Sequence, residues 1–205
     1  MYSAAELRAR YNNLMKTVPS RNPVHVYCDG SVSDNGRAGC GALVLDCSRD
    51  TVCEHEYSMR LSDHISSTLA ELQALKLGLS KVLSCNKNVY VFVDSRVALD
   101  SLNSGSPVYQ GLTAHCKNMI HAIESTGHTV QFYWVPSHAG IAYNDRVDQI
   151  AKRATEKENI EISCSLSLHQ IRSIIKEKQQ DVAMETCVEK YETRATFRHY
   201  HKIHA

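Results

Sequence analysis

Two runs of strand-forming residues in this chain each end at an aspartate. Val24–Cys28 leads into Asp29, and Val89–Val93 leads into Asp94. Runs of this kind are typical of strands buried on both faces of a sheet, and open α/β sheets bind ligands at the carboxyl ends of such strands. If the two strands are neighbours, their carboxylates lie side by side, which is costly unless a cation lies between them. The pair therefore indicates a metal site.

The order of the predicted elements indicates an α/β fold with a five-stranded mixed sheet. Strands are predicted at about 23–29, 39–46, 51–60, 88–94 and 129–135. Helices are predicted at 66–84, near 95–103 and 108–125, and after a loop at 136–143, with Asn144 or Asp145 as the cap. Short turns make the first three strands an antiparallel meander, and a right-handed crossover makes the first and fourth strands parallel neighbours. Alternating residues in the third strand predict one solvent-exposed face.

Composition and pattern divide the chain into three parts. Residues 1–22 contain a capping-box pattern, Ser3 with Glu6, and are expected to form a helix or linker. Residues 23–156 hold the predicted sheet and its helices. Residues 157–205 alternate charged with sparse apolar residues, which predicts a peripheral amphipathic helix. The segment 197–204 is rich in histidine and could bind a metal or nucleic acid, although a frayed tail is the simpler interpretation.

Charge and cysteine content narrow the function classes. With 23 basic and 22 acidic residues the net charge is +1, so any nucleic-acid binding must be local. The eight cysteines form no CxxC pair, and we interpret them as reduced thiols. Cys47, Cys53 and His55 make the one zinc-like group, with buried thiols in strands as the alternative. Without a signal-peptide pattern or a long apolar stretch, we expect a soluble intracellular protein with no membrane partner.

Two further acids are expected to face the same strand ends. Glu71 shares its helix face with small and apolar residues, so its carboxylate should point inward. Asp148 lies one turn beyond Asn144, with Ala151 three residues on, and can face the sheet edge. Four converging carboxylates make an oxygen-rich pocket suited to Mg²⁺ or Mn²⁺ rather than zinc. Each acid alone could instead start a turn, lie on a solvated helix face or partner a helix dipole.

These residues, in this order, resemble the type 1 ribonuclease H family. The resemblance covers about residues 23–156 and rests on these segments: Asp29-Gly-Ser, Leu-Ala-Glu71-Leu-Gln-Ala-Leu, Val-Asp94-Ser, and Trp134-Val-Pro-Ser-His138-Ala-Gly with Asn144 and Asp148 following. It implies an RNase H-like fold with helices on both faces of the sheet. It also implies an endonuclease that hydrolyses the RNA strand of RNA/DNA hybrids. Within the family, the helix around Glu71 and the His138 loop look most like the RNase H domains of non-LTR retrotransposons.

The resemblance also implies the catalytic roles. Asp29, Glu71, Asp94 and Asp148 would hold two Mg²⁺ ions, or Mn²⁺ in their place, with Asp29 bridging them. Two ions around one phosphate can activate the nucleophile and stabilise the leaving 3′ oxygen. His138 matches the family's mobile histidine, which assists proton movement or product release, and its glycine-flanked loop would let it move.

The family's contacts to the hybrid match this sequence less completely than its catalytic residues do. The candidate substrate-binding residues are Gly30, Ser31, Asn35, Ser66, Ser67, Ser95, Arg96 and Asn144. Asn35 matches a family asparagine that reads the minor groove, and Ser66 stands where the family uses threonine to grip a DNA phosphate. Ser67 and Arg96 depart from the usual asparagine and glutamine, which leaves their contact chemistry open. RNA can be distinguished from DNA there by contacts to the 2′-hydroxyl across a wide minor groove.

A basic substrate-gripping protrusion, found in some members of the family, is missing from this sequence. Lys117 is the only lysine or arginine between Val97 and Ser137. Because phosphate neutralisation dominates affinity for nucleic acid, the domain alone should bind hybrid weakly and with strong salt sensitivity.

Two other functions are compatible with the same fold. A catalytically weak or inactive nucleic-acid-binding module is one, although an inactive copy should have lost a carboxylate. A DNA transposase or resolvase is the other, although it would not be expected to combine Glu71 with the His138 loop. The sequence contains no recognisable reverse transcriptase segment, which fits a retroelement-derived domain with reverse transcriptase or other retroelement domains as partners. Tyr133 and Trp134 are expected in the core.

Overall fold

The computed structural model divides into two units, Met1–Cys164 and Ser165–Ala205, and the first contains every helix and strand named below. Each unit is considered by itself. The structure describes residues 2–18, 22–48, 51–104 and 107–166, and positions 168, 171, 172, 174–176, 178–180 and 182–186.

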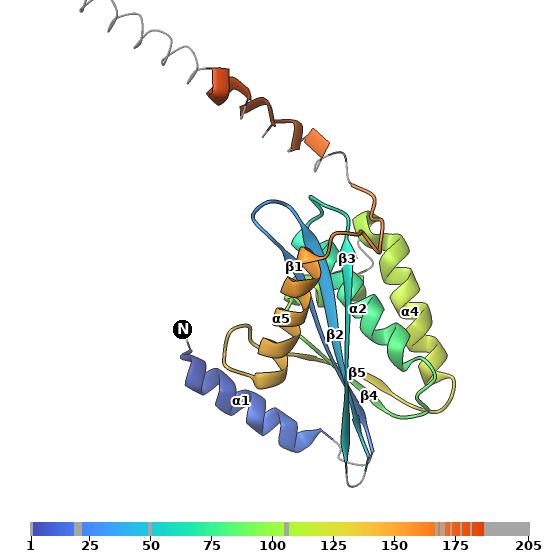
Figure 1. Ribbon diagram of the computed structural model, residues 1–205. Helices are drawn as coiled ribbons and strands as arrows, with labels where there is room; N and C mark the ends of the chain where they lie inside the picture. Colours follow the sequence, from blue (N-terminus) through green and yellow to red (C-terminus); the bar gives the residue numbers. More distant parts are fainter. Residues whose placement is uncertain are drawn as a thin grey trace, which may run out of the picture. The chain divides into compact units, whose positions relative to one another are not determined.

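A five-stranded mixed sheet forms the centre of the first unit (Figure 1). Its strands are β1 (Val24–Val32), β2 (Ala38–Cys47), β3 (Val52–Leu61), β4 (Val89–Val93) and β5 (Val130–Trp134). Their order in the sheet is β3-β2-β1-β4-β5. β1 pairs with β2, and β2 with β3, in antiparallel fashion, whereas β1 with β4 and β4 with β5 are parallel. The predicted mixed sheet is therefore confirmed.

Helices cover both faces of this sheet. They are α1 (Ala4–Thr17), α2 (Ser67–Val82), α3 (Arg96–Ser104), α4 (Gln110–Glu124) and α5 (Ala142–Glu156), with a short 3-10 turn at Pro107–Tyr109. Figure 1 shows α1 and α5 on one face, and α2 and α4 on the other. α2 and α5 both pack against β1 and β2, so the middle strands lie between two helical layers.

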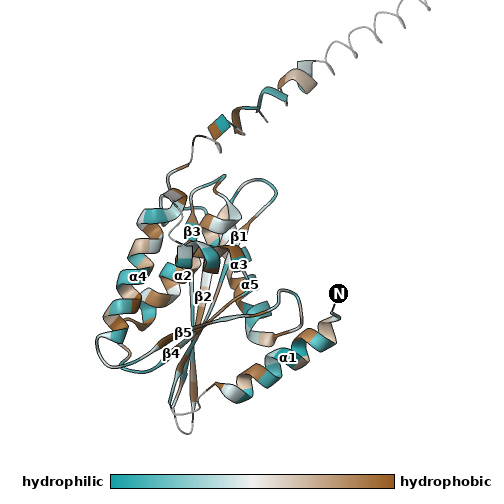
Figure 2. Ribbon diagram, turned by 180° about the vertical axis from the view of Figure 1, so that it is seen from behind, coloured by the Kyte–Doolittle hydropathy of each residue, from teal (hydrophilic) through white to brown (hydrophobic). Residues whose placement is uncertain are grey.

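The core lies where the two buried runs pair. All five residues of β4 are buried, and Tyr27 of β1 stacks on Phe92 of β4 with ring centroids 4.6 Å apart. Figure 2 shows hydrophobic residues along the central strands and hydrophilic ones on much of α1 and α4. Burial of these side chains on both faces fixes β1 and β4 side by side, and their carboxyl ends therefore meet at one edge.

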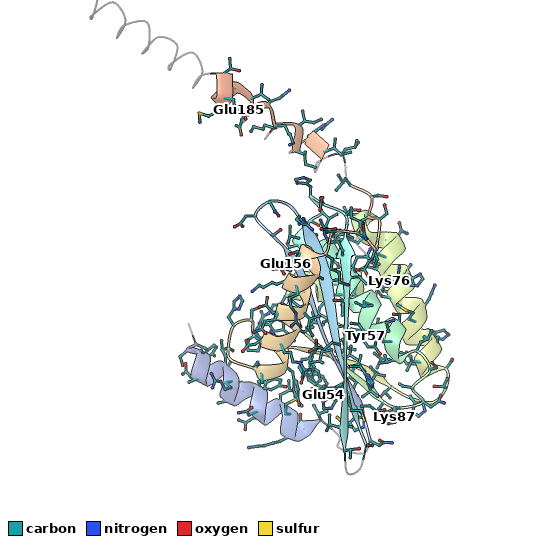
Figure 3. The ribbon with its side chains drawn as sticks, viewed as in Figure 1. Glu54, Tyr57, Lys76, Lys87, Glu156 and Glu185 are labelled. Atoms are coloured by element: carbon teal, nitrogen blue, oxygen red, sulfur yellow. The ribbon has the colours of Figure 1, made fainter. Side chains whose placement is uncertain are left out.

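β3 does not show the predicted pattern of one solvent-exposed face and one buried face. Its first five residues are all exposed, and burial increases toward Leu61. Side chains still alternate, because Glu54 pairs with Arg146 of α5, while Lys81 of α2 lies 4.7 Å over the ring of Tyr57. Figure 3 labels Glu54 and Tyr57 on this strand. β3 is an edge strand, so exposure changes along its length rather than between its faces.

Helix starts were predicted with mixed success. Ser66 caps α2 by accepting a hydrogen bond from the backbone N–H of Leu69, as expected. Ser3 and Glu6 form the predicted capping box of α1. The predicted cap of α5 at Asn144 or Asp145 is wrong, because the helix begins at Ala142 and both residues lie within its first turn.

The cysteines and the lengths of the helices can also be compared with the predictions. Every cysteine in the described part of the chain is a free thiol, and Cys187 lies outside that part. Cys47, Cys53 and His55 form no metal-ligand group in the described ranges. None of the helices that the structure describes is both long enough and apolar enough to span a bilayer.

The chain after α5 returns to the sheet before the second unit begins. Ile162 forms a parallel bridge with Leu61, and the Arg60 carbonyl accepts hydrogen bonds from the N–H groups of Glu161 and Ile162. In the second unit, several described positions between 168 and 186 are helical, and Leu168, Ile175 and Val182 are exposed. The histidine-rich segment 197–204 lies outside the described residues.

Candidate active site

Three carboxylates meet where the parallel pairing of β1 with β4 ends. The predicted end of the first strand at Asp29 is wrong, because β1 continues to Val32 in its antiparallel pairing with β2. Cys28 pairs with Val93 in the parallel ladder, so Asp29 and Asp94 follow side by side. Glu71 of α2 joins them, and one carboxylate oxygen from each of the three lies within 4.8 Å of the others. We call Asp29, Glu71 and Asp94 the acidic cluster. Asp29 is only 7% exposed and forms the buried side of the cluster, whereas Glu71 and Asp94 are partly exposed.

Gly30 lets α2 approach closely enough to deliver Glu71. A Cβ atom on Gly30 would lie 2.3 Å from the backbone carbon of Ala70 and from the backbone nitrogen of Glu71. Only a residue without a side chain fits there. The Gly30 N–H in turn donates to Glu71 Oε2 at 3.2 Å, which holds that carboxylate inward.

Asp94 is held by two residues that come later in the chain. Asn144 Nδ2 donates to Asp94 Oδ2 at 3.1 Å, and Trp134 Nε1 donates to the Asp94 carbonyl at 2.8 Å. Asn144 is 3% exposed, and its own Oδ1 is buried without a hydrogen-bond partner in the structure. Asn144, predicted as a helix cap and a substrate contact, therefore orients a cluster carboxylate.

Asp148 lies near the acidic cluster without belonging to it. Its Oδ2 accepts a hydrogen bond from Lys152 Nζ at 2.7 Å, one helical turn along α5. Its charge nevertheless raises the pKa of Asp29. The structure thus brings three of the four predicted acids together and pairs the fourth with a lysine that the sequence interpretation did not consider.

Burial and mutual repulsion both disfavour the charged forms of the carboxylates in the acidic cluster. Burial raises the pKa of Asp29 above its ordinary value, and the charges of Asp94 and Asp148 raise it further, while Lys152 lowers it. Burial likewise raises the pKa of Glu71, with added contributions from Asp29 and Asp94. Carboxylates in this situation are stabilised by a cation, and an all-oxygen set suits Mg²⁺ or Mn²⁺. The donor set therefore fits a hard divalent ion.

A metal-free sample should lose stability as the pH rises. The ordinary pKa values, 3.8 for Asp29 and 4.5 for Glu71, describe the unfolded chain, and both values are raised in the folded protein. Between the unfolded and folded values the folded state binds more protons, so the free energy of unfolding falls as the pH rises through that window. We expect a lower melting temperature in EDTA at pH 8 than at pH 5, and its recovery when Mg²⁺ is added at pH 8.

The control for this measurement is Asp29→Asn, which removes one charge from the cluster. Its melting temperature in EDTA should fall less between pH 5 and pH 8 than that of the wild type. If the melting temperature depended on pH equally in both proteins, groups outside the acidic cluster would be responsible for that dependence.

His138 lies on an exposed loop between β5 and α5. The residue is exposed and has a left-handed backbone, with φ +52°. Gly140 is also left-handed, with φ +70°, whereas Ala139 between them is 1% exposed. The loop thus presents the His138 imidazole outward from a buried anchor.

The predicted substrate contacts lie on turns and helix starts. Ser66 and Ser95 accept hydrogen bonds from Leu69 N and Ala98 N, respectively, and so cap α2 and the first turn of α3. Asn35 Oδ1 accepts from the Ser33 hydroxyl at 2.6 Å within the β1–β2 turn. The others in this set are placed as follows: Gly30 and Ser31 within β1, and exposed Ser67 at the start of α2.

Trp134 corrects the expectation that this residue lies in the core. It is 37% exposed, and the guanidinium of Arg96 lies 4.1 Å above its ring. Tyr133 is only partly buried and stacks on Phe92. β5 is an edge strand, which is why apolar residues in it do not imply burial. Arg96, two residues after Asp94, is thereby held against the exposed ring of Trp134.

Comparison with known proteins gives consistent matches. The RNase H family model matches residues 21–156. A ribonuclease H of Ehrlichia canis is 28% identical over 148 residues, which cover 66% of this chain and 97% of that protein. A ribonuclease H of Pelobacter propionicus is 27% identical over 162 residues, covering 72% of this chain and 95% of that protein.

Solved structures share the fold. RNase H1 of the halophilic archaeon Halobacterium salinarum has a TM-score of 0.54 at 20% identity, covering 65% of this chain and 98% of that chain. LC11-RNase H1, isolated from compost, has a TM-score of 0.54 at 21% identity, covering 66% and 96%. With the family model matched over most of the chain and the mixed sheet observed, the chain belongs to the RNase H family and is a ribonuclease H.

Proposed function

We propose that this ribonuclease H cleaves the RNA strand of RNA/DNA hybrids with two divalent metal ions, held by Asp29, Glu71, Asp94 and Asp148. The observation that carries the proposal is the acidic cluster, in which one carboxylate oxygen from each residue lies within 4.8 Å of the others, just past the parallel pairing of β1 with β4. Its raised pKa values mark carboxylates in need of a cation. A relative by fold, LC11-RNase H1, has been crystallised in complex with an RNA/DNA hybrid.

The chain's own residues would position the ions and the substrate. Asp29, at the base of the cluster, would contact both ions, and Asp148 would join once its pairing with Lys152 gives way. When bound, the ions would lower the pKa of the attacking water and neutralise charge on the leaving 3′ oxygen. Asn144 keeps the Asp94 carboxylate in place for this role. His138 would assist proton movement or product release from its exposed loop.

A panel of substrates tests this function against the alternatives. Labelled RNA/DNA hybrid, double-stranded RNA and double-stranded DNA are each incubated with the protein and Mg²⁺. Cleavage confined to the RNA strand of the hybrid is expected. Binding without cleavage would indicate an inactive nucleic-acid-binding module, and cleavage of the DNA duplex would indicate a transposase- or resolvase-type nuclease.

The proposed domain organisation places catalysis in residues 23–156, preceded by the α1 segment and followed by an extension from 157 onward. The extension is not helical from its start, because residues 157–164 belong to the first unit and Ile162 bridges Leu61. We also propose a retroelement origin, with reverse transcriptase or other retroelement domains as partners. The support is the likeness of the Glu71 helix and the His138 loop to the RNase H domains of non-LTR retrotransposons. A partner would also supply the phosphate contacts that the missing basic protrusion leaves out.

Binding of the hybrid by this chain alone should be weak and salt-sensitive. The inactive variant Asp94→Asn allows the affinity to be measured by fluorescence anisotropy in Mg²⁺ without cleavage. We expect binding at low salt that falls by at least about 10-fold between 50 and 200 mM salt, because contacts to phosphate dominate affinity. A low-salt affinity above that of an enzyme that carries the basic protrusion would contradict this prediction.

A further inference from the structure

The helix before the catalytic sheet contacts the loop that carries His138. Arg8 of α1 donates from Nε to the Ala139 carbonyl at 3.1 Å. A Cβ atom on Gly140 would lie 2.3 Å from Arg8 Nη2, so the guanidinium rests directly against the backbone of Gly140. Arg8 therefore contacts the two residues that follow His138.

The loop that Arg8 contacts has an unusual backbone. His138 and Gly140 are both left-handed, and this conformation is unfavourable for a residue with a side chain such as histidine. A backbone of this kind persists only where surrounding groups fix it. Buried Ala139 and Ile141 anchor the loop from below, and Arg8 holds it from the α1 side.

α1 is itself fastened to the strands of the acidic cluster. The Tyr11 hydroxyl shares a 2.6 Å hydrogen bond with that of Tyr27, a fully buried residue two positions before Asp29. The Tyr11 ring also meets the edge of Phe92, two positions before Asp94. α1 therefore links β1 and β4 to the His138 loop.

Packing between α1 and the start of the loop is incomplete. A cavity of about 130 Å³ lies there, lined by Leu7, Arg10, Tyr11, Leu14, Trp134 and Pro136. Side-chain packing alone thus leaves room for this part of the loop to shift, and the polar contact of Arg8 is the directional restraint.

We propose that Arg8 is a positioning residue for His138, which holds the loop in its observed backbone geometry and so sets the rate of turnover. The proposal rests on the proposed function, because it assigns His138 a part in the reaction cycle. Without Arg8 the Ala139 carbonyl loses its donor and the loop populates other conformations. The fraction of molecules in which the loop has its observed conformation then falls, and kcat falls in proportion.

The test compares Arg8→Ala with a matched variant on the same helix, Lys16→Ala. Both remove one positive charge, but Lys16 is exposed and its Nζ donates to Asn13 Oδ1 within α1 at 3.4 Å. On hybrid with Mg²⁺, Arg8→Ala should lower kcat by about 10-fold, the lower end of the range for losing a hydrogen bond from a charged group, with little change in KM. Lys16→Ala should leave kcat unchanged, and Arg8→Lys, which keeps a donor, should restore part of the loss.

A double mutant separates positioning from a general structural role. Arg8→Ala added to His138→Ala should cause no further loss of kcat, because both changes act through one residue. Losses that multiply would overturn the proposal, and so would an unchanged kcat in Arg8→Ala.

Hydrogen exchange provides a readout that does not depend on activity. Peptides that cover residues 136–141 should exchange faster in Arg8→Ala than in the wild type or Lys16→Ala. An unchanged exchange rate would overturn the proposal even in an active enzyme. If Arg8→Ala exchanged faster but the wild type cleaved no hybrid, Arg8 would still hold the loop and the proposed function would be wrong.

Discussion

Asp94→Asn should abolish hybrid cleavage while leaving the fold intact. The substitution keeps the shape of the side chain, and an amide oxygen can still accept the hydrogen bond from Asn144 Nδ2. The backbone contact with Trp134 is also unaffected. What is lost is one carboxylate of the acidic cluster. Metal-assisted charge stabilisation is worth several kcal/mol, so we expect kcat/KM to fall by about 10³-fold or more.

The same variant should be more stable than the wild type in EDTA. The Asp94 charge raises the pKa of both Asp29 and Glu71, which means that the three carboxylates repel one another in the folded state. Removing one charge relieves this repulsion, and Mg²⁺ should then stabilise the variant less than the wild type.

Asp100→Asn is the matched control, because Asp100 is exposed on α3. It should leave cleavage and the effect of Mg²⁺ unchanged. Retained cleavage in Asp94→Asn would contradict the assignment of this residue, and an equal loss in Asp100→Asn would show that the effect is not specific to the cluster.

Arg60→Met should destabilise the fold by about 3 kcal/mol or more, because it leaves buried carbonyls without a donor. Arg60 is 2% exposed near the end of β3. Its guanidinium donates to the carbonyls of Ala38 at 2.8 Å and Lys157 at 3.2 Å, and it pairs with Asp63. One side chain thus joins β2, the β3–α2 turn and Lys157, the residue that follows α5.

Thermal or urea unfolding measures this loss, and a decrease of roughly 6–12 °C in Tm corresponds to it for a chain of this size. Arg153→Met is the control. Arg153 is 63% exposed and pairs with Glu56, so its loss should change the free energy of unfolding by about 1 kcal/mol at most. A similar small change in Arg60→Met would mean that the buried carbonyls find other partners.

The sequence was informative where burial and strand pairing decide the structure. Runs as apolar as Val89–Val93 have few alternatives to a central strand, and the crossover rule then places Asp29 beside Asp94. The inward direction of Glu71 also followed from helical spacing, although the close approach of α2 at Gly30 required coordinates. Connection rules therefore predicted that β1 and β4 are neighbours, and helical spacing predicted that Glu71 joins them in the acidic cluster.

Contacts between elements distant in sequence could not be predicted in this way. Asn144 has the composition of a helix cap, yet the helix starts earlier and its amide reaches Asp94. Trp134 belongs to an apolar run, but β5 lies at the sheet edge and leaves it exposed beneath Arg96. Nothing in the spacing of α1 indicates that Arg8 meets the His138 loop. Lys152 is different, since its i,i+4 spacing from Asp148 was visible in the sequence.

The chemistry of the cut ends provides the sharpest test of the proposed mechanism. Hybrid with RNA labelled at one end is cleaved, and the new termini are identified by their reactivity toward phosphatase, kinase and ligase. Attack by water with a leaving 3′ oxygen predicts 5′-phosphate and 3′-hydroxyl ends, formed with Mg²⁺ and lost in EDTA or in Asp94→Asn. Ends with a 2′,3′-cyclic phosphate, or cleavage that persists in EDTA, would contradict hydrolysis at the acidic cluster.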